Sequence, residues 1–299
     1  MFDKLFTPYR INSMTLPNRL VLPAMVLLFC CLFFPKSGFA FSHSKPIDKH
    51  YVLTEARKKY YNLRNHGLKD FRAQADVNWQ LMIDSMNISD SINTPLEKAV
   101  APYALSKLAK EYKAIHFDVL LDSENNVSVT HHLDHPFTDT STIRQVNRTT
   151  KATEKNISSF FSAWSQYLFD SPFLITDSTY DVIDSADDYW ISHQADDAYI
   201  RMRMSKDFII REKFIFYPTY HAHIVTDFQL SSEGLLLTTF DATADILSNG
   251  SISNHAHLTY KCDYSNVDGF QLPHTVTART DNAPSVEWTF SNYSLKRID

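Results

Sequence analysis

Four histidines form two pairs with the same spacing. His221 and His223 are two residues apart, and so are His255 and His257. Residues two apart on a β-strand lie on one face, so each pair would present both imidazoles to the same side. If the two strands paired, four imidazoles could converge on a zinc or copper ion. The favoured interpretation is a polar, solvent-facing sheet surface, with the metal site as its alternative. We expect no bound cofactor.

Other chemical motifs are missing from the sequence. It contains no G-x-S-x-G motif, and its five glycines are scattered, so no glycine-rich loop is available to cradle a phosphate. The net charge is −5 and the pI is about 6.2, which gives no electrostatic reason to expect nucleic acid as a partner. These features favour a binding protein over an enzyme.

Aromatic side chains are the more informative group, with 21 Phe, 15 Tyr and 4 Trp. Phe208, Phe214 and Phe228 occupy alternating strand-like positions, and Phe161 and Trp164 lie on one stripe of a predicted helix. Together they predict an apolar pocket that would suit a lipid or another hydrophobic ligand. Alternatively, the predicted helices themselves fill the space that the sheet encloses.

The elements that would position these side chains follow from hydrophobic periodicity. Residues 142–170 carry an i, i+3, i+4, i+7 apolar stripe and predict a long helix. Eight alternating segments separated by turn residues follow between residues 187 and 298, as in an antiparallel meander. The fold class expected is therefore α+β, with a large curved antiparallel sheet, an incomplete barrel, and helices packed against its concave face. No linker is evident after residue 49, so residues 41–299 are expected to form one domain.

Shorter elements are predicted upstream. Residues 42–63 read as a capped helix, and residues 69–83 read as a strand with one wet face. Thr94 and Pro95 mark the start of another helix, and a hairpin is expected to turn at residues 124–126.

The order of these elements resembles the periplasmic lipoprotein-carrier superfamily. The resemblance spans residues 46–299 and rests on the helix "LTEARKKYYNLRNHGLKDF", on the following strand and helices, and on the final segments "VDGFQLPHTVTA" and "EWTFSNYSL". It implies an incomplete antiparallel barrel that closes over helices and shelters acyl chains. The function implied is binding by burial, without covalent chemistry.

The N-terminus carries a different resemblance. "LFTPYRINSMTLPNRLVLPAM", within residues 1–25, is similar to the start of the Old Yellow Enzyme family of NADH:flavin oxidoreductases. Pro23 and Met25 match a flavin-contacting turn of that family, while Val26 stands where a threonine is usual. This fragment implies an alternative function as an FMN-dependent oxidoreductase. Such an enzyme needs a (β/α)8 barrel, and the downstream pattern does not predict one.

Residues 20–34 form an apolar run of 15 residues, preceded by Arg19 and followed by Pro35 and "SGFA". This layout is typical of a secretion signal with cleavage near Ala40, and it defines an N-terminal segment over residues 1–40. The protein is therefore expected to be exported, to the periplasm or the outside, with an N-terminal membrane anchor as the alternative. A third functional hypothesis is an envelope-interaction protein that binds another protein and no ligand.

Overall fold

The computed structural model describes residues 47–84, 109–137, 140–173, 176–195, 197–248, 251–281 and 283–298. From Asp48 onward these residues belong to one compact unit. The N-terminal segment predicted for residues 1–40, with its signal run and its flavin-enzyme-like start, lies outside the described residues. The predicted helix start at Thr94 and Pro95 also lies outside them.

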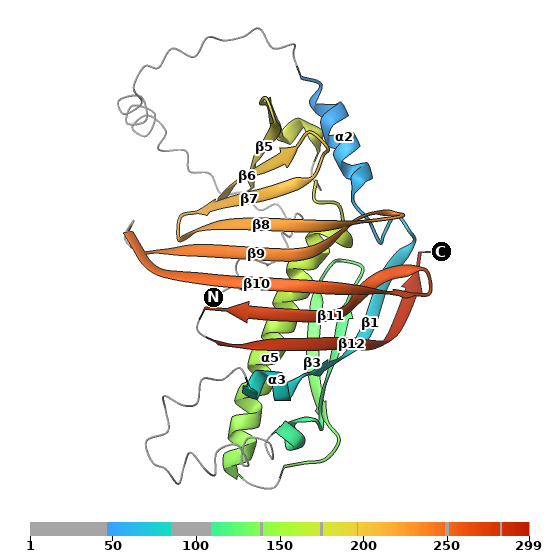
Figure 1. The fold of residues 1–299 in the computed structure, drawn as a ribbon, viewed down its shortest axis with the longest axis vertical. Helices are drawn as coiled ribbons and strands as arrows, with labels where there is room; N and C mark the ends of the chain where they lie inside the picture. Colours follow the sequence, from blue (N-terminus) through green and yellow to red (C-terminus); the bar gives the residue numbers. More distant parts are fainter. Residues whose placement is uncertain are drawn as a thin grey trace, which may run out of the picture. The chain divides into compact units, whose positions relative to one another are not determined.

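One antiparallel sheet dominates the described chain (Figure 1). Its strands are β1 (Leu68–Val77), β2 (Ile115–Leu121), β3 (Val127–Leu133), β4 (Asp181–Asp184), β5 (Asp188–Ala195), β6 (Ala198–Ser205), β7 (Ile210–Tyr217), β8 (Tyr220–Ser231), β9 (Gly234–Ser248), β10 (Ser251–Val267), β11 (Phe270–Thr280) and β12 (Ala283–Arg297). Their order in the 12-stranded sheet is β3-β2-β1-β12-β11-β10-β9-β8-β7-β6-β5-β4. Every pair of named strands is antiparallel. The prediction of a large antiparallel sheet is confirmed, and β3 and β4 form its two edges within the described residues.

Alternating side chains give these strands two distinct faces. In β8, Tyr220, Ala222 and Ile224 are buried, and they alternate with the more exposed His221 and His223. The eight alternating segments of the sequence correspond to β5 through β12. The edge strand β4 was not predicted, because its four residues are too few to show a periodicity.

The shorter helices differ from their predicted bounds for local reasons. Helix α2 (Lys49–Lys59) begins at Asp48, whose side chain accepts a hydrogen bond from the Tyr51 amide at 3.1 Å. It ends where Tyr60 forms an isolated bridge with Leu235 of β9. The strand predicted for residues 69–83 is wrong at its end. There Asn78 accepts a hydrogen bond from the Leu81 amide at 3.1 Å and begins helix α3 (Trp79–Asp84).

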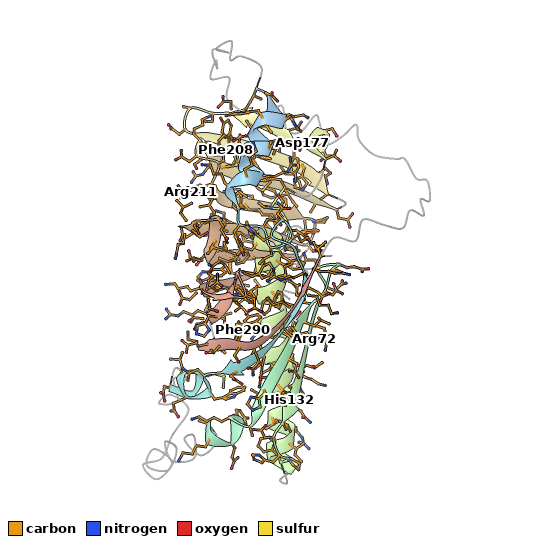
Figure 2. All side chains as sticks on the ribbon, turned by 90° about the vertical axis from the view of Figure 1, so that its right-hand side faces the viewer. Arg72, His132, Asp177, Phe208, Arg211 and Phe290 are labelled. Carbon is orange, nitrogen blue, oxygen red and sulfur yellow. The ribbon has the colours of Figure 1, made fainter. Side chains whose placement is uncertain are left out.

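Helix α5 (Thr140–Leu168) lies across one face of the sheet (Figure 1). We call this the helix face, and it carries Phe71, Tyr260 and Phe290. The ring of Phe160 lies 5.4 Å from that of Tyr260, and the ring of Phe161 lies 5.1 Å from that of Phe290. Turned by 90°, Figure 2 shows the sheet and α5 as two layers with side chains between them. The buried core therefore lies along the predicted apolar stripe of α5.

Candidate ligand-binding site between α5 and the sheet

Three of the five aromatic residues predicted to line a pocket lie between α5 and the sheet. Phe161 and Trp164 are fully buried on α5. Phe228 of β8 reaches the same layer, where its ring lies 5.9 Å from Tyr167 of α5 and 5.2 Å from Tyr60. The structure thus brings together Phe161, Trp164 and Phe228.

The other two residues lie elsewhere. Phe214 lies on the opposite face of the sheet, which we call the far face, and stacks on His223 at 4.5 Å. Phe208 sits in the turn between β6 and β7 with a φ of 64°, and its ring lies 5.9 Å from that of Tyr189. They do not line a common pocket with the first three residues.

An irregularity in β7 explains the position of Phe214. Arg203 pairs with Glu212, whereas the next residue, Met204, pairs with Ile210, so one residue of β7 is bulged out. A bulge reverses which residues face each side of the sheet. Lys213 and Ile215 consequently share the helix face with Ile210, and Phe214 does not.

A small cavity lies between α5 and strands β9 and β10. Its volume is about 10 Å³, and its lining is almost wholly apolar. The lining residues are Phe160, Ala163, Trp164, Leu237, Thr238, Phe240, Tyr260 and Cys262. Such a volume holds about one water molecule. Cys262 is buried, and burial raises the pKa of its thiol.

Hydrogen bonds fix the aromatic wall of this cavity. The Trp164 indole Nε1–H donates to the Tyr264 hydroxyl at 2.9 Å, and Tyr264 donates in turn to the Leu237 carbonyl at 2.6 Å. This chain of donors ties α5 to β10 and β9. It also satisfies groups that would otherwise be unpaired in an apolar layer.

Two further donors in the same layer have no hydrogen-bond partner among the described residues. They are the Tyr167 hydroxyl and the Trp288 indole Nε1, and both residues are buried. Burial raises the pKa of Tyr167, so its hydroxyl stays protonated. The Trp288 ring lies 6.3 Å from Tyr260, which lines the cavity. Unpaired donors beside an apolar cavity can satisfy a polar atom of a bound molecule.

A partly buried lysine lies on the helix face, where sequence reasoning did not place one. Lys213 Nζ donates to Gln166 Oε1 of α5 at 3.3 Å, and burial lowers the pKa of Lys213 to about 8. His193 of β5 lies close by. Its own burial and the charge of Lys213 lower the pKa of His193 to about 4. In the sequence this lysine stands between Glu212 and Phe214 in a strand-like run. The face of the sheet to which it points cannot be predicted unless the bulge in β7 is known.

The four histidines of the predicted metal site do not converge. Strand β9 lies between β8 and β10, so the two pairs sit on strands that are not neighbours. His221 pairs with Asp245 of β9, and Asp245 pairs with His255 on the other side. His223 and His257 face each other across β9 in the same way. The two pairs are thus two strand spacings, about 10 Å, apart, with residues of β9 between them.

Several of these imidazoles contact carboxylates instead. His257 lies 3.0 Å from Asp241 and 2.9 Å from Asp281, and His255 lies 2.6 Å from Asp245. Hydrogen bonds to Asp281 and Asp241 raise the pKa of His257 and outweigh the lowering effect of burial, the largest single cause. Within the part of the chain that the structure describes, no group of three or more His, Cys, Asp or Glu side chains could hold a metal ion.

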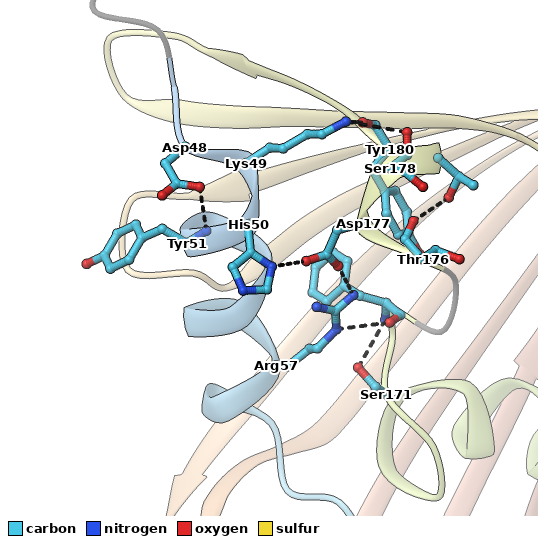
Figure 3. A network of polar contacts seen from close by, with 12 residues as sticks. Asp48, Lys49, His50, Tyr51, Arg57, Ser171, Thr176, Asp177, Ser178 and Tyr180 are labelled. Atoms are coloured by element: carbon cyan, nitrogen blue, oxygen red, sulfur yellow. Dashed lines mark hydrogen bonds and ion pairs between the residues drawn. The ribbon is translucent and has the colours of Figure 1, made fainter.

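A polar network attaches α2 near one end of the sheet (Figure 3). Asp177, in the 3-10 helix η3 (Asp177–Thr179), lies 2.6 Å from Arg57 Nη2 and 2.5 Å from His50 Nδ1. Arg57 Nε also donates to the Phe173 carbonyl at 3.1 Å. The hydrogen bond from Arg57 lowers the pKa of Asp177. We interpret this network as a structural clamp. Its side chains already form hydrogen bonds and ion pairs with one another, so few of their polar atoms are left to bind a ligand.

Comparison with protein families and with curated sequences adds no relative. No protein-family model matches the chain, and no curated protein matches its sequence. Among the described helices, none is both long enough and apolar enough to cross a membrane.

Proposed function

We propose that this protein is an exported, non-catalytic binding protein that shelters a lipid or another hydrophobic ligand between α5 and a curved, half-barrel sheet. The observation that carries the proposal is the apolar cavity between α5 and strands β9 and β10. It lies in the layer where the resemblance to the lipoprotein-carrier superfamily expects an acyl chain. Binding would occur by burial, without a covalent step.

Ligand entry requires α5 to move away from the sheet. The cavity of about 10 Å³ accommodates about one water molecule, so an acyl chain would need additional space. Ala163 is the smallest side chain that α5 contributes to the lining, and it is 2% exposed. An acyl chain would therefore lie closest to the backbone of α5 next to Ala163.

The test is native mass spectrometry of the chain expressed with its own N-terminus in a bacterial host. A mass that begins at Phe41, with a lipid-sized addition removed by organic extraction, supports an exported lipid binder. Ala163→Val fills the cavity and should reduce the added mass. Ala152→Val places the same side chain on an exposed position of α5 and should retain it.

Two other outcomes would favour the competing hypotheses. The mature mass with nothing bound would favour an envelope-interaction protein. The far face supports that alternative with Tyr199, Phe216 and Val225, which are 42%, 39% and 38% exposed. An intact N-terminus with a bound flavin would favour the FMN-dependent enzyme. That fold needs parallel strands alternating with helices, whereas β1 to β12 pair antiparallel.

A further inference from the structure

We propose that the ligand is an anionic amphiphile, a long-chain carboxylate, whose head group is bound by Lys213 while its chain occupies the layer beneath α5. This inference rests on the function proposed above and specifies the ligand class. It places the polar end of the ligand at β7 and the apolar end toward β9 and β10.

The face on which Lys213 lies is the first step. Lys213 pairs with Ile224 of β8 and with Met202 of β6, and both of these neighbours are buried on the helix face. Its ammonium group therefore points into the layer that α5 covers, where it meets Gln166. A cation within an apolar layer is costly unless a counter-charge accompanies it.

The second step is the lack of such a counter-charge. Among the described residues, Lys213 forms no ion pair, and the acceptor of its hydrogen bond is the neutral amide oxygen of Gln166. Arg203 of β6, by contrast, has a counter-charge, because it lies 2.6 Å from Glu212 on the far face. Burial lowers the pKa of Lys213 to about 8, and no carboxylate contributes to that shift. An anionic head group would supply the missing charge.

Neighbouring polar groups suit a carboxylate. His193 Nδ1 is buried and has no hydrogen-bond partner among the described residues. Burial, and secondarily the charge of Lys213, lower the pKa of His193 to about 4, so its imidazole is neutral and can donate one hydrogen bond. Gln166 is itself oriented, because its Nε2 donates to the Ser162 carbonyl at 3.1 Å. A carboxylate with two oxygens could accept from both Lys213 and His193.

The last step connects this polar group with the cavity. Gln166 follows Ala163 by three residues on α5, so the two lie on one side of the helix about 4.5 Å apart along its axis. Ala163 lines the cavity, and Gln166 contacts Lys213. Strands β7 and β9 are two spacings apart, or about 10 Å. An acyl chain whose head group lies at Lys213 can therefore run along α5 into the apolar cavity.

The test compares a fluorescent fatty acid, cis-parinaric acid, with its methyl ester in equilibrium titrations of the mature protein. The two probes share the chain and differ in the charge of the head group. The wild type should bind the acid about tenfold more tightly than the ester, as expected for one charged hydrogen bond. Lys213→Met should remove this preference by weakening the binding of the acid. Lys261→Met, an exposed lysine on β10, should behave like the wild type.

The outcomes separate the two proposals. If wild type binds acid and ester equally, the head-group assignment is overturned while hydrophobic binding stands. If neither probe binds, the proposed function fails and this inference fails with it. The comparison within the wild type needs no substitution, so a folding defect in Lys213→Met would leave the test decisive.

Discussion

The indole of Trp164 and the hydroxyl of Tyr264 are joined across the helix–sheet interface by a hydrogen bond of 2.9 Å. Trp164 is fully buried, and Tyr264 passes the interaction on to the Leu237 carbonyl. Removing the shared hydroxyl would leave the buried Trp164 indole N–H without its acceptor. The interaction therefore couples the aromatic wall of the cavity to the stability of the sheet.

Tyr264→Phe is expected to lower the free energy of unfolding by about 1–3 kcal/mol, the usual cost of leaving a buried polar group unpaired. Tyr199→Phe removes a hydroxyl from an exposed residue of β6 and should change it by less than about 0.5 kcal/mol. Urea unfolding of both variants measures the difference. Equal stabilities would show that the Trp164–Tyr264 interaction does not hold α5 in place.

The partly buried Lys213 predicts that the stability of the protein rises with pH. Its pKa is about 8 in the folded protein, whereas the ordinary value for an exposed lysine is 10.5. Between these two pH values the unfolded chain therefore binds more protons than the folded protein does. Stability should therefore increase as pH rises from about 8 to about 10.5, by about 1–3 kcal/mol. His193, with a pKa of about 4, stays neutral throughout this range. Below pH 8 the penalty for burying the charge is fully present.

Lys213→Met supplies the comparison, because it removes the titrating group and keeps a similar apolar volume. Unfolding free energies at pH 7.5 and pH 10 should differ in the wild type more than in the variant. Tyrosines and other lysines titrate in both proteins and cancel in the difference. A variant with the same pH dependence as the wild type would contradict the burial of the Lys213 ammonium group.

How far the sequence predicts this fold can be judged from particular residues. Strict alternation located the strands from β5 to β12, and the apolar stripe of α5 located the core, because both signals are local. The face of Phe214 was not predictable, since it depends on a one-residue bulge before Glu212. The separation of His221 from His255 depends on β9 lying between their strands, which residue spacing does not encode.

The clamp at Asp177 predicts a local effect on α2. Asp177→Asn weakens the interactions with Arg57 and His50, and these side chains are 20%, 29% and 77% exposed. We expect a loss of about 1 kcal/mol or less, because partly exposed ion pairs contribute modestly. Hydrogen exchange should show faster exchange in α2 and unchanged exchange in β9 and β10. Glu55→Gln, which breaks the exposed pair with Lys58, serves as the control and should leave exchange in α2 nearly unchanged.

Adding a single methyl group at Gly234 is expected to destabilise the fold strongly. It lies at the start of β9 with a φ of +138°, and a Cβ there would stand 2.6 Å from the Tyr61 amide nitrogen and 2.9 Å from the Tyr60 carbonyl carbon. Both atoms belong to backbone, so neither can rotate away. Gly234→Ala should cost about 2–4 kcal/mol, since a steric clash adds to the strain of a positive φ.

Gly269 provides the matched control for this substitution. Its φ is +92°, and nothing lies within 4 Å of a Cβ built there. Gly269→Ala should therefore cost only the conformational strain, about 1–2 kcal/mol. Thermal unfolding of both variants measures the difference. Equal losses would mean that the chain after α2 does not pack against Gly234 as described, and the bridge between Tyr60 and Leu235 would then have to be questioned.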